Sequence, residues 1–183
     1  MTSLPLSSFN NTSMKNTTPQ LDAEALYKTL ATQIQHGLQS IPDAAIVGIH
    51  SGGAWLAERL AADLGLTARL GFVDPSFYRD DYAERGLRPD VKPSQIPFEV
   101  EGATILLVDD VLYTGRTTRA AINELFDYGR PAKIMLAALV DRGERELPIA
   151  ATFVALHHSV APNESIVLHR GTNGKFSLTV EHA

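Results

Sequence analysis

Short apolar runs alternate with amphipathic segments along most of this chain. After Asp22, a candidate N-cap, leucine or isoleucine recurs every four residues from Leu26 to Leu38, and such a stripe is one face of an amphipathic helix. The later pattern is of strand-length apolar runs separated by helical stretches. It predicts strands over 44–49, 70–73, 104–108, 134–140, 152–156, 166–168 and 176–180, and helices over 54–64 and 118–128.

The run from Thr104 to Val108 is the strongest strand candidate, because its residues are almost continuously apolar. Continuous apolar character is typical of a central parallel strand that is buried on both faces. Strands and helices also alternate around it. We therefore expect an α/β fold with a mostly parallel central sheet and helices on both of its faces.

Two segments lack a hydrophobic period. Residues 1–19 are rich in Ser, Thr and Asn, which predicts a disordered tail, with a short partner-binding arm as the alternative. Residues 20–183 have the length of one domain. Residues 74–97 carry charges of both signs and four prolines, which favours a flexible hairpin or lid over a solvated excursion without a role.

The amino-acid composition excludes several classes of site and partner. The 183 residues contain no cysteine, which excludes disulfides, thiolate zinc sites, iron–sulfur clusters and a cysteine nucleophile. Lys and Arg total 16 against 21 Asp and Glu, a formal charge of −5, so a general basic surface for nucleic acid is not expected. There is no membrane-length apolar run and no signal-peptide pattern, and we expect a soluble cytoplasmic protein.

Three apolar strands end in polar or glycine-rich stretches, namely HSGG at 50–53, DDVLYTGRTT at 109–118 and DRGERE at 141–146. Ligands of open α/β sheets bind outside the carboxyl ends of the strands. If these strands are parallel, the three stretches meet at one edge of the sheet. The sequence therefore predicts one composite site.

The middle stretch carries the most specific chemistry. The adjacent carboxylates of Asp109 and Asp110 need a partner, either a hard cation such as magnesium or the vicinal hydroxyls of a ribose. The alternative is that the two aspartates only cap a helix and form a turn, without binding a ligand. The following residues 114–118 combine a glycine and threonines at a helix start, which favours an anion site. Neither a Walker A loop nor a dinucleotide fingerprint matches, so the pattern favours a ribose 5-phosphate.

The motif ILLVDDVLYTGRT at 105–117 resembles the phosphoribosyl pyrophosphate (PRPP) motif of type I phosphoribosyltransferases. Together with GRP at 129–131 and LVDRGERELPI at 139–149, it is similar to the PyrR family of uracil phosphoribosyltransferases, many of which also regulate pyrimidine operons by binding messenger RNA. The resemblance covers most of residues 21–180. It implies the type I fold, with a flexible lid hairpin and a small hood.

The resemblance also assigns roles to individual residues. Asp109 and Asp110 would bind the ribose hydroxyls and, with Arg79 of the lid (78–81), form the catalytic set. The PRPP-binding and nucleotide-binding set comprises Asp109, Asp110, Val111, Leu112, Tyr113, Thr114, Gly115, Arg116 and Thr117. The pyrophosphate loop would be His50, Ser51, Gly52 and Gly53, and the base pocket Val140, Asp141 and Arg142.

The implied reaction transfers ribose 5-phosphate from PRPP to uracil and yields uridine monophosphate (UMP) and pyrophosphate. Its cofactor would be Mg²⁺, held mainly by PRPP with Asp109 as a candidate ligand. The resemblance further implies a homodimer or homotetramer that has no membrane contact. The alternative function is RNA-binding regulation of transcription attenuation, and a third class is a PRPP or nucleotide sensor without turnover.

The chain departs from the family pattern at two places. The pyrophosphate loop usually carries arginine, whereas residues 50–53 offer only His50 as a candidate countercharge. Glu144 stands where RNA-binding members often have histidine, and Ala150 where they often have arginine. Fewer phosphate contacts weaken RNA binding sharply, so we expect an eroded RNA-binding face.

Five further residues have either two open interpretations or a purely structural one. The side chains of His157 and His158, adjacent on a predicted strand, would point to opposite faces and so not share a metal ion. Trp55 is expected to pack in the core or at an oligomer contact. Arg142 and Arg145 could each either meet substrate or be solvated on a loop.

Overall fold

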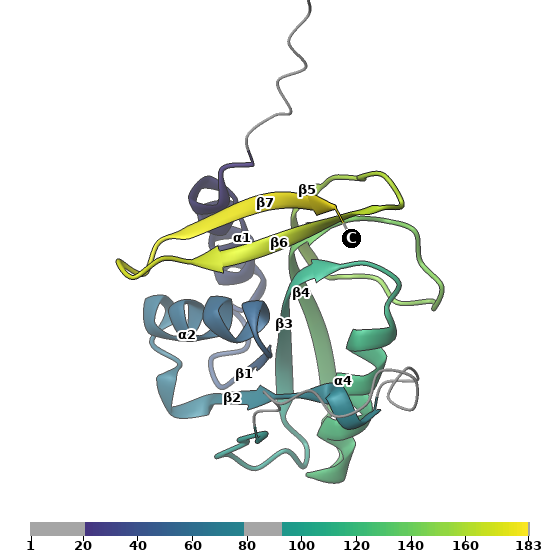
Figure 1. Ribbon diagram of the computed structural model, residues 1–183. Helices are drawn as coiled ribbons and strands as arrows, with labels where there is room; N and C mark the ends of the chain where they lie inside the picture. Colours follow the sequence, from purple (N-terminus) through teal and green to yellow (C-terminus); the bar gives the residue numbers. More distant parts are fainter. Residues whose placement is uncertain (1–20, 79–92, 183) are drawn as a thin grey trace, which may run out of the picture.

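A five-stranded sheet forms the centre of the protein, whose computed structural model describes residues 21–78 and 93–182. The strand order is β2-β1-β3-β4-β5, and every neighbouring pair is parallel. The strands are β1 (Ala45–Ile49), β2 (Leu70–Val73), β3 (Thr104–Leu112), β4 (Lys133–Asp141) and β5 (Phe153–His157). This arrangement, seen in Figure 1, confirms the predicted α/β class.

Helices cover both faces of the sheet, as the pattern predicted. Helices α1 (Ala23–Gly37) and α2 (Gly52–Leu64) pack on the face that carries Leu106 and Val108. Helix α4 (Arg116–Asp127) packs on the opposite face, which carries Ile105 and Leu107. Successive residues of a strand point to opposite faces, so the continuous apolar run of β3 supplies both cores at once.

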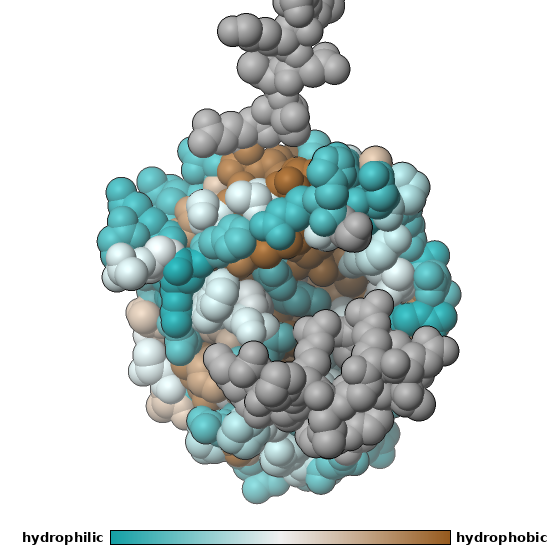
Figure 2. All heavy atoms as spheres, viewed as in Figure 1, coloured by the Kyte–Doolittle hydropathy of each residue, from teal (hydrophilic) through white to brown (hydrophobic). Residues whose placement is uncertain are grey.

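A separate antiparallel hairpin, β6 (Glu164–Arg170) and β7 (Phe176–His182), lies across α1 and α2 (Figure 1). Its inward residues alternate with outward ones and join the α1–α2 core; they are Ile166, Leu168, Phe176 and Leu178. Figure 2 shows a hydrophilic strip along the hairpin with apolar residues on either side of it. The Phe176 ring packs on Tyr27 of α1, with ring centroids 5.8 Å apart. The hairpin therefore corresponds to the small hood that was expected.

Several elements are longer than predicted. Strand β3 was expected to stop at Val108 but continues to Leu112, because β4 pairs with it as far as Asp141. Helix α2 begins at Gly52 rather than at residue 54, and α4 begins at Arg116 rather than at residue 118. The apolar period marks only the buried part of an element, whereas hydrogen bonding to a neighbour extends the element beyond it.

The predicted tail (1–19) and most of the predicted lid, including Arg79, lie outside the described residues. The flanks of the lid segment are described. They are the short 3-10 helix η2 (Pro75–Tyr78) and Gln95, whose amide and carbonyl both bond to Phe72 of β2. A further 3-10 turn, η1 (Thr67–Arg69), precedes β2. Within 21–78 and 93–182, no helix is long and apolar enough to cross a membrane.

Candidate functional site

The three polar stretches predicted to meet do lie at one edge of the sheet, because β1, β3 and β4 are parallel neighbours. We call residues 50–53 the β1 loop, residues 113–117 the β3 loop and residues 142–149 the β4 loop. The β3 loop includes the first residues of α4, and the β1 loop those of α2. That the three loops meet was predicted from the ends of the strands. How β1, β3 and β4 align with one another is known only from the structure.

The β1 loop lies directly against the end of β3. A Cβ at Gly52 would overlap the Asp110 carboxyl group, and one at Gly53 would overlap the carbonyl oxygen of Val108. These two glycines therefore let the start of α2 approach β3 at backbone distance. His50 is half-buried, its ring centroid lies 5.6 Å from that of Phe72, and its peptide bond to Ser51 is cis.

Asp109 and Asp110 lie within β3, so their side chains start on opposite faces of the sheet. Asp109 is 6% exposed, and its Oδ1 accepts the amide of Asp110 at 3.0 Å. Asp110 faces the start of α2. Burial raises the pKa of Asp110, and its hydrogen bonds offset that rise only in part. The sequence showed that two aspartates are adjacent, but it did not show that their carboxylates lie on opposite faces of the sheet.

The β3 loop turns through Gly115, which has a left-handed backbone (φ +91°) and caps α4. Its amide groups lie at a helix start, where an anion is favoured by free N–H donors. The Thr114 hydroxyl accepts the amide of Arg116 at 3.3 Å. The side chain of Ile149 packs against Gly115 from the β4 loop, and a Cβ on Gly115 would meet it at 3.2 Å.

The β4 loop holds the β3 loop through main-chain hydrogen bonds. The amides of Glu146 and Leu147 both donate to the carbonyl oxygen of Thr114, at 3.0 and 3.1 Å. The amide of Arg142 donates to the carbonyl oxygen of Leu112 at 2.9 Å. An exposed ion pair between Arg116 and Glu146 (2.5 Å) adds a side-chain contact. Apart from the family motif at 139–149, no sequence pattern predicted this contact between the loops.

Arg142 joins the hood to the site. Its side chain is buried, and its guanidinium donates to the carbonyl oxygens of Glu164 at 2.7 Å and Ala161 at 3.3 Å. The same group lies over the Tyr113 ring, 4.0 Å from the centroid. The hypothesis of a solvated Arg142 is therefore wrong, because its side chain is needed to hold the hairpin connection.

Val140 and Asp141, at the end of β4, expose different groups at the sheet edge. Val140 is fully buried in the core, and only its backbone lies at the sheet edge. The Asp141 carboxylate accepts from Arg145 at 2.6 Å and from the Gly143 amide at 2.9 Å. Burial opposes its ionisation, but these two donors outweigh that effect and hold the pKa of Asp141 below its usual value. Asp141 is thus a carboxylate at neutral pH.

Two other predictions concern residues at the margin of the site. Trp55 packs under Arg170 of the hood, whose guanidinium carbon lies 5.3 Å from the ring centroid, so packing rather than full burial describes it. His157 Nδ1 lies 3.6 Å from Asp141 Oδ2, and His158 binds Asp141 only through its backbone amide.

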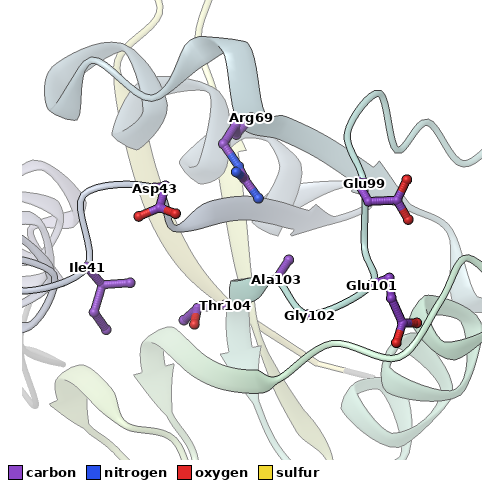
Figure 3. A pocket seen from close by; sticks show the side chains of 8 residues that line it. All are labelled: Ile41, Asp43, Arg69, Glu99, Glu101, Gly102, Ala103 and Thr104. Carbon is purple, nitrogen blue, oxygen red and sulfur yellow. The ribbon is translucent and has the colours of Figure 1, made fainter.

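Two hollows lined by described residues lie near the sheet. One of about 690 Å³ lies between α1 and β5 and includes Gln33, His36 and Asp141 in its lining. The other, of about 320 Å³, lies at the amino-terminal edge of the sheet. Figure 3 shows Arg69 there with the carboxylates of Asp43 and Glu99, at the opposite end of the strands from the three loops. The candidate site is the carboxyl edge, to which Asp141 in the lining of the 690 Å³ hollow also belongs.

Comparison with known proteins agrees with this geometry. Residues 15–169 match the phosphoribosyl transferase domain family. The structure is similar to that of a hypoxanthine-guanine phosphoribosyltransferase from Bacillus anthracis, with a TM-score of 0.59, 20% identity and coverage of 81% of this chain and 85% of that one. A hypoxanthine phosphoribosyltransferase from Staphylococcus aureus gives a TM-score of 0.58 at 23% identity, covering 80% and 77%. These likenesses establish the type I phosphoribosyltransferase fold.

Sequence relatives are more specific. The chain is 53% identical over 170 residues to the "Bifunctional protein PyrR" of Ralstonia nicotianae, covering 90% of this chain and 97% of the relative. It is 51% identical over 162 residues to the protein of the same name from Nitrosococcus oceani, covering 86% and 92%. The chain therefore belongs to the PyrR family of phosphoribosyltransferases.

Proposed function

We propose that this protein is a uracil phosphoribosyltransferase that uses PRPP and releases UMP and pyrophosphate. The observation that carries the proposal is the meeting of the β1, β3 and β4 loops at one sheet edge, with Asp110 packed against the β1 loop. In this proposal the starts of α4 and α2 form two anion sites, with carboxylates between them. PRPP has this order of groups: a 5-phosphate, a ribose diol and a diphosphate.

In this proposal the β3 loop binds the 5-phosphate through its amides and threonine hydroxyls. Asp109 and Asp110 accept hydrogen bonds from the ribose hydroxyls, which orients the sugar. The bond from the anomeric carbon to pyrophosphate breaks as the sugar gains positive charge, and a bond to N1 of uracil forms while the N1 proton is released. Donors fixed before the reaction stabilise the developing charges without reorganisation.

The leaving pyrophosphate would face the β1 loop, where Gly52 and Gly53 leave the backbone accessible. Magnesium fits this part of the site, because carboxylate oxygens are ligands that it prefers. It would neutralise charge on the diphosphate. Among the described residues, no three metal-binding side chains cluster. The resemblance has PRPP supply most of the ligands, with Asp109 as the protein's candidate, whereas the carboxylate that faces the β1 loop is that of Asp110.

The base would lie beside the end of β4, where the backbone of Val140 and the Asp141 carboxylate reach the sheet edge. Arg142 is committed to the hood, so its backbone rather than its guanidinium would line this pocket. Arg79, the lid residue assigned to catalysis by resemblance, remains a prediction because it lies outside the described residues.

The direct test is to incubate the protein with PRPP, Mg²⁺ and uracil, cytosine, hypoxanthine or guanine in separate reactions and to detect nucleotide by chromatography. We expect UMP from uracil and no product from the other bases. A chelator control should abolish the reaction. If PRPP binds by calorimetry but no base yields nucleotide, the protein is a sensor rather than a transferase.

RNA-binding regulation of attenuation is a second proposal, favoured by the word "bifunctional" in the relatives' name. Glu144 and Ala150 and the formal charge of −5 argue that this binding is weakened here. A gel shift with a pyrimidine-operon leader RNA and UMP tests it. No retention at micromolar protein and physiological salt would exclude it. The expected homodimer or homotetramer can be measured by light scattering.

A further inference from the structure

Arg145, in the middle of the β4 loop, joins the ends of β3 and β4 through its side chain. One terminal nitrogen (Nη1) donates to the carbonyl oxygens of Tyr113 at 2.5 Å and Gly143 at 3.0 Å, with a longer contact to Leu112 at 3.4 Å. Its Nε donates to the carbonyl oxygen of Ile149 at 3.0 Å. The other terminal nitrogen donates to the Asp141 carboxylate at 2.6 Å.

All three guanidinium nitrogens are therefore occupied by groups of the protein, and the side chain is 23% exposed. Each of these bonds is made by an ionised donor, which makes it stronger than a bond between neutral groups. The planar fork of arginine sets the directions of its acceptors relative to one another. Arg145 is thus arranged to hold backbone, with its charge balanced by Asp141.

The bond to Tyr113 has a consequence for the neighbouring amide. In a trans peptide unit the C=O of one residue and the N–H of the next are coplanar and point in opposite directions. When Arg145 holds the Tyr113 carbonyl, it also aims the Thr114 N–H away from the β4 loop. The amides of Glu146 and Leu147 hold the Thr114 carbonyl and aim the Gly115 N–H in the same manner.

We propose that Arg145 is a positioning residue, which aims the Thr114 amide at the 5-phosphate and ties this amide to Asp141 at the base side of the site. The inference rests on the proposed function, because it concerns how the amides that would bind the 5-phosphate are held in position. Arg145 does not touch substrate. It acts through the carbonyl of Tyr113 and the carboxylate of Asp141.

The proposal predicts an effect on one half of the substrate only. The β1 loop packs against β3 through Gly52 and Gly53, whereas the hydrogen bonds of Arg145 go to residues at the ends of β3 and β4 and in the β4 loop. Loss of Arg145 should therefore weaken binding of ribose 5-phosphate while leaving binding of magnesium pyrophosphate unchanged. Misplacement of a binding group by about 1 Å can cost about a hundredfold in rate, which sets the expected scale for kcat/KM.

The experiment compares Arg145→Ala and Arg145→Lys with Arg59→Ala. Arg59 is a matched control, because it is also a partly exposed arginine (34%) with a bidentate carboxylate partner, Glu24, but it holds α1 and the hood rather than the loops. Calorimetry measures affinity for ribose 5-phosphate and for magnesium pyrophosphate. Steady-state assays measure the KM for PRPP and kcat, and thermal melting measures stability.

We expect Arg145→Ala to lower kcat/KM for PRPP by about a hundredfold, mainly through KM, and to lower ribose 5-phosphate affinity alone. Arg145→Lys keeps the charge but not the fork, so it should recover part of the loss. Arg59→Ala should lower the melting temperature without separating the two affinities. Because Arg145→Lys is the milder change, it carries the test if Arg145→Ala does not fold.

Two outcomes overturn the inference. One is an equal loss of ribose 5-phosphate and pyrophosphate affinity in both Arg145 variants, which indicates general destabilisation. The other is a lower melting temperature with unchanged KM, kcat and affinities, which indicates a purely structural role. If the unaltered protein binds neither ribose 5-phosphate nor PRPP, it is the proposed function that fails, and the two failures are thereby distinguished.

Discussion

The β1 loop and the β3 loop are both strand-to-helix turns at the same sheet edge, yet they are held in different ways. The β3 loop is fixed by hydrogen bonds from the β4 loop to the carbonyls of Leu112, Tyr113 and Thr114. The β1 loop is placed by close contact of Gly52 and Gly53 with β3. One loop is therefore shaped by hydrogen bonds and the other by the absence of side chains at its glycines.

This difference matches what each site is proposed to hold. A 5-phosphate stays on the sugar throughout the reaction and can be held by a rigid set of amides. A leaving diphosphate must depart, and it brings magnesium as its own countercharge. The β1 loop contains no arginine, which is consistent with magnesium supplying the countercharge of the diphosphate. Four substitutions, ordered by expected effect, test the comparison.

The largest effect is expected for Gly53→Ala. The added Cβ would overlap the Val108 carbonyl oxygen, and because this is backbone in the central strand, the start of α2 must shift. We expect a loss of stability of about 1–3 kcal/mol and loss of detectable transfer. Denaturant unfolding and the UMP assay measure the two.

Gly65→Ala is the matched control for that variant. Gly65 has a left-handed backbone (φ +70°) with open space around it, so alanine there costs about 1–2 kcal/mol through strain alone. Its transfer activity should be unchanged. If Gly53→Ala is as active as Gly65→Ala at equal stability, the close approach of the β1 loop to β3 does not matter for function.

The next effect is expected for Asp110→Asn, and its two readouts should move in opposite directions. Removing one charged acceptor should reduce kcat/KM by an amount equivalent to about 1.5–3 kcal/mol, or roughly tenfold to a hundredfold. Burial raises the pKa of Asp110, so the ionised carboxylate destabilises the folded protein, and the variant should be more stable at neutral pH.

The stability gain expected for Asp110→Asn depends on pH. A carboxyl whose pKa is raised on folding weakens stability as pH rises from its unfolded to its folded pKa, and the cost persists above that range. The gain from Asp110→Asn should therefore vanish below the unfolded pKa of an aspartate. Melting curves across acidic and neutral pH measure it, and a variant less stable than the parent at neutral pH would contradict it.

A smaller effect is expected for Asp141→Asn, and its pH dependence has the opposite sign. Arg145 and the Gly143 amide hold the pKa of Asp141 low, so this carboxylate stabilises the fold above its unfolded pKa and the contribution disappears as pH falls through its folded pKa. We expect a loss of about 2 kcal/mol at neutral pH. Chemical denaturation at neutral pH, where the loss is present, and at strongly acidic pH, where it should be absent, checks this.

The smallest effect is expected for Glu146→Gln. The Arg116–Glu146 ion pair is about half exposed on both sides, and such pairs contribute about 0–1 kcal/mol. The main-chain amide of Glu146 still binds Thr114 in the variant. Stability and the KM for PRPP should stay close to those of the parent. A large rise in KM would mean that the ion pair, rather than the backbone, holds the β3 loop.

Much of the site was predictable because its chemistry is local in sequence. The acidic pair, Gly115 and the threonines occupy one continuous stretch, and a helix start with free amides binds anions wherever it lies. The glycines of the β1 loop also stood out as a break in the apolar pattern. Their actual neighbours, Asp110 and the Val108 carbonyl, are more than fifty residues away and could not be assigned.

The sequence by itself determined the α/β class, the order of the elements and the polar loops at the ends of the strands, because hydrophobic period and turn residues act over a few neighbouring positions. The tertiary structure decided that β3 continues to Leu112, that Arg142 holds the hood and that Arg145 holds the β3 loop. Those outcomes depend on which backbone carbonyls lie within reach of a side chain or strand. That proximity exists only once distant segments have packed together, so no local pattern encodes it.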